Sequence, residues 1–543
     1  MTVAEQVPDP TSIEWDAIVI GAGMGGGTLG YALARAGKRV LFVEKGQSFV
    51  DFGADQIRGL TPEETCDLAR LPAPERQAAL ARACRSFDEV ADGSAAKPKS
   101  FVPEIGNGTG GSSALFGMVL ERLFPVDFTP RAQHADATST TLPDAWPIDY
   151  DDLAPWYTAA ERLYRVRGTA DPLRPTVEGD HLLSPPPLTT ANAGVFDFLR
   201  QGGLHPYQLH LACEHLPDCQ TCQGFLCDRQ CKNDAGQICV APALHNHGAT
   251  LLSQCAALRF EAGPRRVDKL ICHWRGDTLA LRAKQFIISA GALATPALLL
   301  RSTSAEWPRG LANASDQVGR NLMRHCIDMT VLRPRGLRQA IRGQTKELAF
   351  NDLYWRDGKK YGSVQSIGGL PPFLHYLGKL GPELRYFRYL RPLLGPLWDW
   401  LRVKVVVLAS ILEDLPYADN RVLPGDNSTV AGQQLFRLEY QLREREQQRA
   451  ASFAAELREL FKPYRPFTLS VSHDNKVIAH VCGTCRMGDN PDASVVDRDC
   501  RAHGVDNLYI ADASFFASSG GINPSLTIAA NALRIAAHLV DRG

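Results

Sequence analysis

The 543-residue chain lacks three features that assign many proteins to a class: an excess of one charge, a long apolar run and a repeated segment. Lys plus Arg equals Asp plus Glu at 59 each, so the net charge is zero and indicates neither nucleic acid nor an acidic polymer as a partner. No apolar stretch reaches the roughly 20 residues that a membrane-spanning helix needs. The length predicts a globular protein with room for two domains.

A targeting signal is also missing from the first residues, MTVAEQVPDPTSIEW. They contain no basic patch, no apolar core and no twin arginine, so they fit neither a secretory nor a twin-arginine signal. We therefore expect a cytoplasmic protein.

Three glycines near the N-terminus form a dinucleotide-binding fingerprint. Gly21, Gly23 and Gly26 directly follow the apolar residues 17–20 and open a segment with helical spacing that ends near residue 36. The first glycine permits the tight turn, the second lets backbone N–H groups approach a pyrophosphate, and the third lets the helix pack on the sheet. The phosphates then lie at the positive end of a helix.

A carboxylate completes this fingerprint. Residues 39–43 read as the next buried strand, and Glu44 at its end follows Gly23 by 21 residues. A carboxylate there accepts hydrogen bonds from ribose hydroxyls and repels a 2′-phosphate, so FAD or NAD fits better than NADP. The sequence thus predicts an α/β fold with a Rossmann-like domain.

The C-terminal 64 residues repeat the pattern of a strand followed by a helix. Residues 508–511 read as a strand that delivers Asp512 at its end, where such sheets present ligand groups. A last helix is predicted to begin at Asn523 as N-cap and Pro524 as first helical residue. If its N-terminus faces an isoalloxazine ring, the helix dipole stabilises the negative charge of the reduced flavin.

Together these and further motifs resemble the glucose-methanol-choline (GMC) family of FAD oxidoreductases. In chain order the additional motifs are GNGTGGSS at 106–113, WPIDY at 146–150, SAGA at 289–292, VGRNL at 318–322, HVCGT at 480–484 and NPSLT at 523–527. The resemblance implies a discontinuous FAD-binding domain of residues 1–135, 232–322 and 482–543. Residues 136–231 and 323–481 would form a substrate domain on a largely antiparallel sheet.

The resemblance also implies roles for particular residues. His480 matches the catalytic histidine of the family and Asn523 the position beside it, so His480 would act as base while the carbinol hydride passes to flavin N5. Histidine suits this role because its pKa lies near working pH. His473 is a competitor to exclude by mutation. The residues expected to bind the cofactor are Gly21, Gly23, Gly26, Glu44, Gly110, Gly111, Ser112, Ser113, Asp512, Asn523, Pro524 and Thr527.

One departure from the family pattern concerns the flavin environment. After Gly-Gly-Ser-Ser the family often has an Asn and then an Arg-Gly pair, whereas this chain has Phe116 and then Arg122 and Leu123. A polar flavin contact is therefore expected to be missing. The fold of the family can be inferred for this chain, whereas its preference for an electron acceptor is a weaker inference.

Cysteines are dense in one region. Of fourteen in the chain, six lie in residues 213–239, namely Cys213, Cys219, Cys222, Cys227, Cys231 and Cys239. Such thiols hold zinc, hold an iron-sulfur cluster, or pair as disulfides, which a reducing cytosol disfavours. The region resembles sugar dehydrogenases of the family with a three-iron cluster, which implies Cys222, Cys227 and Cys231, or Cys213 and Cys219 with one of them, as candidate ligands. Cys482 and Cys485 are interpreted as packed residues and not as a redox pair.

An apolar and arginine-containing segment, residues 371–403, is interpreted as short helices of the substrate side. Its alternatives are a pocket entrance, a buried face or a peripheral contact with a membrane surface. Residues 405–412 read as a strand of the substrate sheet.

The sequence therefore predicts FAD-dependent oxidation of a sugar, cyclitol, polyol or bulkier alcohol, with a dehydrogenase favoured over an oxidase. Its expected partners are a small-molecule alcohol and an external electron acceptor, together with a peripheral membrane or small-subunit partner. Two alternatives stay open: a non-redox FAD-containing lyase, and an electron-relaying subunit of a membrane-linked dehydrogenase.

Overall fold

The computed structural model describes residues 9–57, 68, 71–94, 99–174, 181–217, 219, 222–334, 346–356, 358–370, 391–425, 435–470, 472, 475, 478 and 480–542. His473 and most of the apolar segment 371–403 lie outside these residues. No helix in the described part of the chain is long and apolar enough to cross a membrane.

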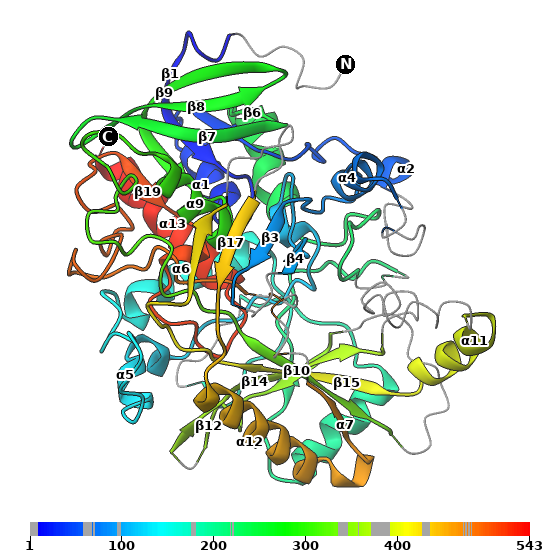
Figure 1. Ribbon diagram of the computed structural model, residues 1–543. Coiled ribbons are helices and arrows are strands. Elements are labelled where there is room, and N and C mark those ends of the chain that lie inside the picture. Colours follow the sequence, from blue (N-terminus) through cyan, green and yellow to red (C-terminus); the bar gives the residue numbers. More distant parts are fainter. Residues whose placement is uncertain are drawn as a thin grey trace.

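The N-terminal fingerprint lies in a seven-stranded sheet at the top of Figure 1. Its strands run in the order β6-β2-β1-β9-β8-β7, and β19 pairs with β9. They are β1 (Glu14–Ile20), β2 (Val40–Val43), β6 (Thr250–Leu252), β7 (Cys255–Ala262), β8 (Val267–Trp274), β9 (Asp277–Ile288) and β19 (Leu508–Ile510). The strands β6, β2, β1, β9 and β19 are parallel, whereas β7 and β8 are added antiparallel. The predicted Rossmann-like α/β class is confirmed.

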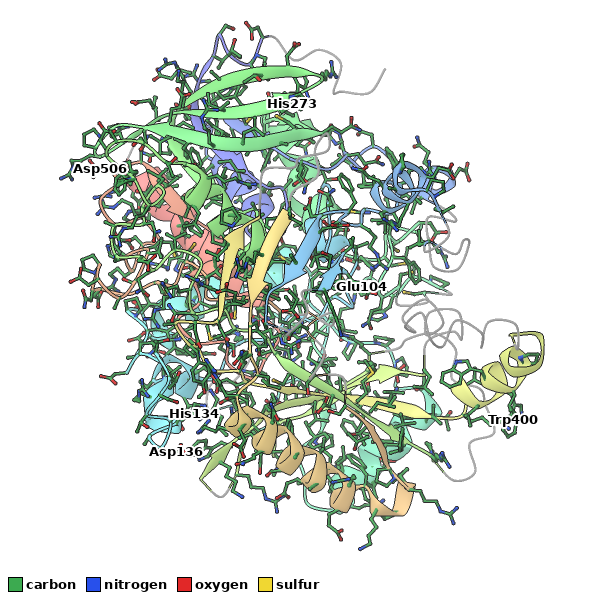
Figure 2. The ribbon with its side chains drawn as sticks, viewed as in Figure 1. Glu104, His134, Asp136, His273, Trp400 and Asp506 are labelled. Atoms are coloured by element: carbon green, nitrogen blue, oxygen red, sulfur yellow. The ribbon has the colours of Figure 1, made fainter. Side chains whose placement is uncertain are left out.

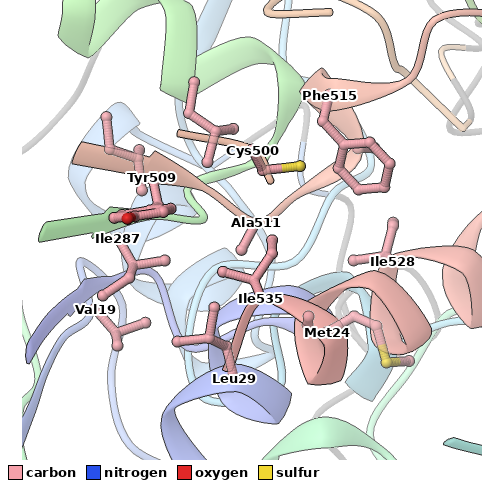
Figure 3. Close-up of a cluster of buried hydrophobic side chains, with 14 of the residues drawn as sticks. Val19, Met24, Leu29, Ile287, Cys500, Tyr509, Ala511, Phe515, Ile528 and Ile535 are labelled. Carbon is pink, nitrogen blue, oxygen red and sulfur yellow. The ribbon is translucent and has the colours of Figure 1, made fainter. Parts of the chain in front are cut away.

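Helices cover this sheet and bury its apolar residues. Helix α1 (Met24–Arg35) packs on α13 (Ser525–Arg542), which in turn packs on α6 (Tyr150–Leu163), and α9 (Gly291–Arg301) follows β9. Figure 3 shows how Val19 and Ile287 of the sheet lie near Leu29 of α1 and Ile535 of α13. These contacts join the first and last segments of the chain. Cys482 and Cys485 are buried in the same core, as predicted.

A six-stranded antiparallel sheet lies below, in the order β18-β10-β15-β14-β11-β5 (Figure 1). Its strands are β5 (Tyr207–Gln208), β10 (Cys326–Leu332), β11 (Leu348–Phe350), β14 (Gly362–Gly368), β15 (Val406–Leu412) and β18 (Phe467–Leu469). Helices α7 (Thr190–Gln201) and α12 (Glu444–Leu460) share a buried cluster with residues of this sheet. The predicted largely antiparallel sheet is therefore present, while the domain boundaries stay a prediction.

Side chains of the central strands alternate between two environments, as the period of two in a strand requires. Val364 of β14 and Leu408 of β15 pack in the cluster with α7 and α12. Their neighbours Gln365 and Ala409 instead line a cavity between the two sheets. One face of the sheet is thus core and the other is the wall of a site.

A four-stranded sheet bridges the two halves. It consists of β16 (Arg421–Pro424), β17 (Leu435–Glu439), β3 (Glu89–Asp92) and β4 (Lys99–Phe101), with β17 parallel to β3. Its strands come from segments that the sequence assigned to different domains.

The remaining helices and strands are α2 (Ala54–Ile57), α4 (Ala73–Arg82), α5 (Pro130–Gln133), α8 (Ala241–His247), α11 (Arg391–Arg402), β12 (Trp355–Arg356) and β13 (Lys359–Lys360), with 3-10 helices at Gly111–Ala114, Pro125–Phe128, Lys462–Tyr464 and Ala513–Phe515 and a π-helix at Gly236–Val240.

A buried ion network lies beneath the cavity. The Lys360 Nζ is 2.6 Å from an oxygen of Asp127 and 2.8 Å from one of Glu413, and all three side chains are fully buried. His134 Nε2 lies 2.9 Å from Glu413, and the Tyr354 hydroxyl donates to Asp127 at 2.7 Å. Burial raises the pKa of Glu413, but Lys360 and His134 outweigh it and hold the pKa below its usual range. The network is stable only as a complete set, because removing one buried charge leaves the others uncompensated.

Replacing Lys360 by Met is accordingly expected to lower the free energy of unfolding by about 3–5 kcal/mol, because two buried carboxylates lose their counter-ion. Denaturant unfolding followed by tryptophan fluorescence measures the change. Lys359→Met, at the exposed neighbouring residue of β13, is the control and is expected to change stability by less than about 0.5 kcal/mol. Equal stability of the two variants would contradict this account of the network.

Candidate functional site

A cavity of about 860 Å³ lies between the seven-stranded and the six-stranded sheet. Its upper wall is formed by the turn after β1, the end of β2 and the N-terminal region of α13, and its lower wall by β10, β14 and β15. Glu104, which also lines it, lies between the two halves of the molecule in Figure 2. The lower wall is apolar apart from Gln365, with Ile327, Met329, Ile367, Ala409 and Ile411 facing inward.

The turn after β1 requires glycine for close approach. A Cβ on Gly21, whose φ is +97°, would lie 2.3 Å from the carbonyl oxygen of Ser289, and one on Gly25 only 1.8 Å from that of Ala511. A Cβ on Gly23 would instead make only ordinary van der Waals contact, with Gly111 Cα at 3.8 Å. The cavity therefore meets bare backbone at Gly23 and the N-terminus of α1, and these groups fit the pyrophosphate of a dinucleotide.

Glu44 is fixed beside this turn. One carboxylate oxygen accepts from the N–H of Ala22 at 2.9 Å, and the other from the N–H of Gly46 at 2.8 Å. The side chain is buried and lines the cavity, with lone pairs left for a ligand. This arrangement suits the acceptor for ribose hydroxyls that the sequence predicts at this position.

The residues predicted to bind the cofactor fall into two groups. Those that line the cavity are Gly21, Gly23, Glu44, Gly111, Ser112, Ser113, Asp512, Asn523 and Pro524. Gly26, Gly110 and Thr527 are not among the lining residues. A Cβ on Gly26 would lie 2.0 Å from the oxygen of Gly21, so Gly26 serves helix packing, and the Thr527 hydroxyl is 2.8 Å from that of Tyr157 between α13 and α6.

Asp512 braces the upper wall as well as lining it. One of its oxygens accepts from the N–H of Gly291 at 2.9 Å and from the Thr295 hydroxyl, and the other accepts from the N–H of Ser514 at 2.8 Å. Burial raises the pKa of its carboxyl group. Asp512 thus fixes the start of α9 against the end of β19.

His480 and Asn523 both line the cavity, although 43 residues separate them in the sequence. Helix α13 begins at Ser525, and Pro524 O accepts the first helical hydrogen bond, from Ile528 N at 3.0 Å. Asn523 was predicted to be the N-cap, but it lies one residue before the residue that caps α13. Its Oδ1 instead accepts from Gln365 Nε2 at 2.8 Å, and no described residue accepts from its N–H₂ group, which can therefore donate to a substrate oxygen.

A second histidine and a lysine surround His480. His325 Nδ1 lies 2.8 Å from His480 Nδ1, and the rings meet edge to face. Burial, with His325 and Lys346 nearby, holds the pKa of His480 well below its usual value. Burial also lowers the pKa of Lys346 to about 8. His480 is therefore neutral at neutral pH, as a general base must be.

Three residues of this site, Gln365, His325 and Lys346, were not predicted from the sequence. The position of His325, three residues after the VGRNL motif, is a signal that could have indicated it, whereas Gln365 and Lys346 lie in segments without a motif. Phe116, the residue that departs from the family pattern, does line the cavity. Lys346 also lines the cavity, and its Nζ lies close to Gly117, where an added Cβ would be 2.8 Å away.

The cysteine run forms a small pocket of its own. Five thiols line it: Cys213, Cys219, Cys222, Cys227 and Cys231. Cys239 lies apart, with its sulfur 3.4 Å from the Tyr164 hydroxyl. The pocket also contains Gly117 and Lys346, which line the large cavity too, so the two sites are neighbours. No disulfide joins any of the thirteen described cysteines.

Comparison with protein families finds three matches along the chain. Two models described as GMC oxidoreductase match residues 204–327 and 416–532. A model described as FAD binding domain matches residues 16–51, which contain the glycine turn and Glu44. The second GMC match contains both His480 and Asn523.

Full-length relatives give the same result. The chain is 28% identical to paromamine 6′-oxidase of Streptomyces fradiae over 97% of this chain and 92% of the relative. It is 25% identical to 2-methyl-1,2-propanediol dehydrogenase of Mycolicibacterium austroafricanum, over 97% and 95%. Identity is also 25% to the fructose dehydrogenase large subunit of Gluconobacter japonicus, over 96% and 97%. Among solved structures, pyridoxine 4-oxidase from Mesorbium loti shares the fold with a TM-score of 0.62 and 19% identity over 97% of this chain and 99% of that one.

The position of Glu44 makes FAD affinity testable. Glu44→Gln places an amide N–H₂ group against the N–H of Ala22 or Gly46, which loses an acceptor and displaces the turn. We expect FAD to bind roughly 10–100-fold more weakly, the equivalent of about 1–3 kcal/mol. Quenching of FAD fluorescence on titration with apoprotein measures the affinity. Glu14→Gln, at the exposed start of β1, is expected to leave it unchanged, and an unchanged affinity in Glu44→Gln would refute the role.

Proposed function

Since the chain belongs to the GMC oxidoreductase family and binds FAD, we propose that it oxidises a primary or secondary alcohol to an aldehyde or ketone. The observation that carries the proposal is the position of His480 and Asn523 in the cavity that the glycine turn also lines. Bound FAD supplies the acceptor for the carbinol hydride, at N5. The hydroxyl proton goes to His480, so the C–H and O–H bonds break as the carbonyl double bond forms.

Asn523 and Gln365 orient the alcohol in this proposal. Gln365 Nε2 holds the Asn523 oxygen at 2.8 Å, which leaves the Asn523 N–H₂ group to donate to the carbinol oxygen. That oxygen gains negative charge as its proton leaves, and a positioned donor stabilises the charge. Neutral His480 takes the proton without competition from Asn523, because an amide does not act as a base.

The substrate class follows from the cavity and the relatives. Named relatives act on paromamine, 2-methyl-1,2-propanediol and fructose, all of which carry several polar groups. The cavity of about 860 Å³ is lined both by the glycine turn and by His480 and Asn523, so FAD and substrate would share it. On the substrate side, the polar side chains of His480, Asn523, Gln365 and Lys346 lie beside the otherwise apolar lower wall. We place the substrate among sugars, cyclitols and polyols, with the bulkier apolar alcohols second.

The cysteine pocket supports a dehydrogenase over an oxidase. Five thiols line one pocket and offer the sulfur donors of an iron-sulfur cluster. Cys222, Cys227 and Cys231 would hold it, or Cys213 and Cys219 with one of them; among the described residues, the ligand atoms of Cys213, His215 and Cys219 lie within 4.8 Å of one another. Gly117 and Lys346 line both this pocket and the large cavity, so such a cluster would lie next to the flavin. A bound cluster would pass electrons to an external acceptor or a partner subunit. The name of one relative, fructose dehydrogenase large subunit, indicates that this relative has a further subunit.

Alcohol oxidation is tested by bleaching of the flavin band in anaerobic protein mixed with a panel of sugars, polyols and aliphatic alcohols. We expect one class to bleach it, and His480→Ala to slow the reduction by about 10²–10⁴-fold through loss of the base. His273→Ala, on β8 and outside the lining residues, is the matched control. A bound flavin that no alcohol reduces would reject the oxidation and favour the non-redox lyase.

The cysteine pocket is tested by iron analysis and visible spectroscopy of anaerobically purified protein. We expect iron in the wild-type chain and its loss in Cys227→Ser, because a serine is a poor ligand for a cluster held by thiolates. Cys239→Ser changes a cysteine of the same run that lies outside the pocket and is expected to retain iron. Iron-free wild-type protein, or equal loss in both variants, would reject the cluster.

A further inference from the structure

Backbone pairing brings two histidines into register behind the reacting position. Met323 N donates to Cys482 O at 3.0 Å, and Cys482 N donates to Met323 O at 2.9 Å. This isolated bridge brings the chain at residue 325 close to the chain at residue 480. The rings of His325 and His480 meet there, with centroids 5.0 Å apart at an interplanar angle of 85° and the two Nδ1 atoms 2.8 Å apart.

The remaining nitrogen of His325 determines where its proton is. His325 Nε2 lies 3.1 Å from the carbonyl oxygen of Ser519 and 2.9 Å from that of Gly520. Carbonyl oxygens only accept hydrogen bonds, so Nε2 must carry a hydrogen. Burial lowers the pKa of His325, and a neutral imidazole carries one N–H group. His325 Nδ1 is then a bare acceptor.

The proton on His480 follows by elimination. Two nitrogens 2.8 Å apart need one hydrogen between them, and since His325 Nδ1 has none, it belongs to His480 Nδ1. The geometry points to His325 as a positioning residue: it selects the tautomer of His480 in which Nε2, on the opposite edge of the ring, carries the lone pair that takes the substrate proton. This inference rests on the proposed function.

Fixed partners hold the two carbonyl groups in place. Gly520 N donates to Glu413 Oε1 at 3.2 Å, and Gly521 N donates to the Tyr354 hydroxyl at 2.9 Å. Both acceptors belong to the buried network around Lys360. The charged groups that act on the two histidines are Glu413 and Asp127 on the side of His325, and Lys346 on the side of His480. Because these groups and carbonyls are fixed, His325 has no alternative hydrogen-bonding arrangement as a neutral ring.

The proposed step balances within the pair. The substrate O–H bond breaks and an N–H bond forms at His480 Nε2, while its Nδ1–H group stays hydrogen-bonded to His325. The positive charge of the new imidazolium is stabilised by the lone pair of His325 Nδ1, in the way that a carboxylate orients and stabilises the histidine of a catalytic triad. A neutral partner stabilises it less than a carboxylate does, so His480 keeps its low proton affinity.

Two substitutions at His325 separate this role from simple packing. Gln keeps an acceptor for His480 and a donor for the carbonyl groups, whereas Leu fills similar space with neither. We expect His325→Leu to lower kcat/KM for the bleaching alcohol by about 10²–10⁴-fold, the range of a lost general base, and His325→Gln to remain within about tenfold of wild type. Both are compared at equal flavin content across pH 5 to 9. Equal loss in both variants would overturn the inference.

A second measurement tests the tautomer without any turnover. Ring nitrogens of ¹⁵N-histidine in the FAD-loaded protein report which of them carries hydrogen, and His480 signals are identified by their loss in His480→Gln. We expect Nδ1 protonated and Nε2 bare in wild type and in His325→Gln, with the ratio reversed toward Nε2–H in His325→Leu. Nε2–H in the wild-type protein would overturn the inference, while absence of alcohol oxidation with the expected tautomer would reject only the proposed function.

Discussion

The ion pairs of Lys360 with Asp127 and Glu413 are the constraint on which the site depends. Asp127 belongs to the 3-10 helix at Pro125–Phe128, Glu413 directly follows β15, and Lys360 ends β13, so one ammonium group joins three distant segments. Glu413 also accepts a hydrogen bond from the N–H of Gly520, and the carbonyl oxygen of Gly520 accepts one from His325. A change in the network can therefore reach His480 through the backbone of Gly520 and the side chain of His325.

The second constraint is the two-sided use of the antiparallel sheet. Along β10, β14 and β15, successive side chains point in turn into the core with α7 and α12 and into the cavity. A shift of one residue in any of these strands would exchange the two faces and bury Gln365 in the apolar core. The strand register that stabilises the sheet thus also delivers the partner of Asn523. Ile327, Met329 and Ile367 line the cavity and do not belong to the cluster with α7 and α12 on the opposite face.

Local sequence patterns were sufficient for the cofactor half of the fold. The glycine turn, β1, α1, β2 and the last helix follow from periodicity and from backbone sterics, which act over a few residues. The resemblance indicated His480 and Asn523. Pairing between distant segments was not accessible: the Met323 and Cys482 bridge brings His325 to His480, and the contact of Gln365 with Asn523 spans 158 residues. The predicted N-cap role of Asn523 was wrong because α13 begins at Ser525, one residue later than predicted.

Burial and charge around His480 favour its neutral form. Burial, with Lys346 nearby, holds the pKa of His480 well below its usual value, so its lone pair is available for the proton of a bound alcohol. His325 is neutral as well, and in the proposed reaction its Nδ1 lone pair would stabilise the His480 ring that has taken the proton. With FAD bound, the N-terminus of α13 and the Lys346 ammonium group would stabilise the negative charge of the reduced flavin. In the proposed function the proton and the electrons therefore end at two separate places, each beside groups that suit its charge.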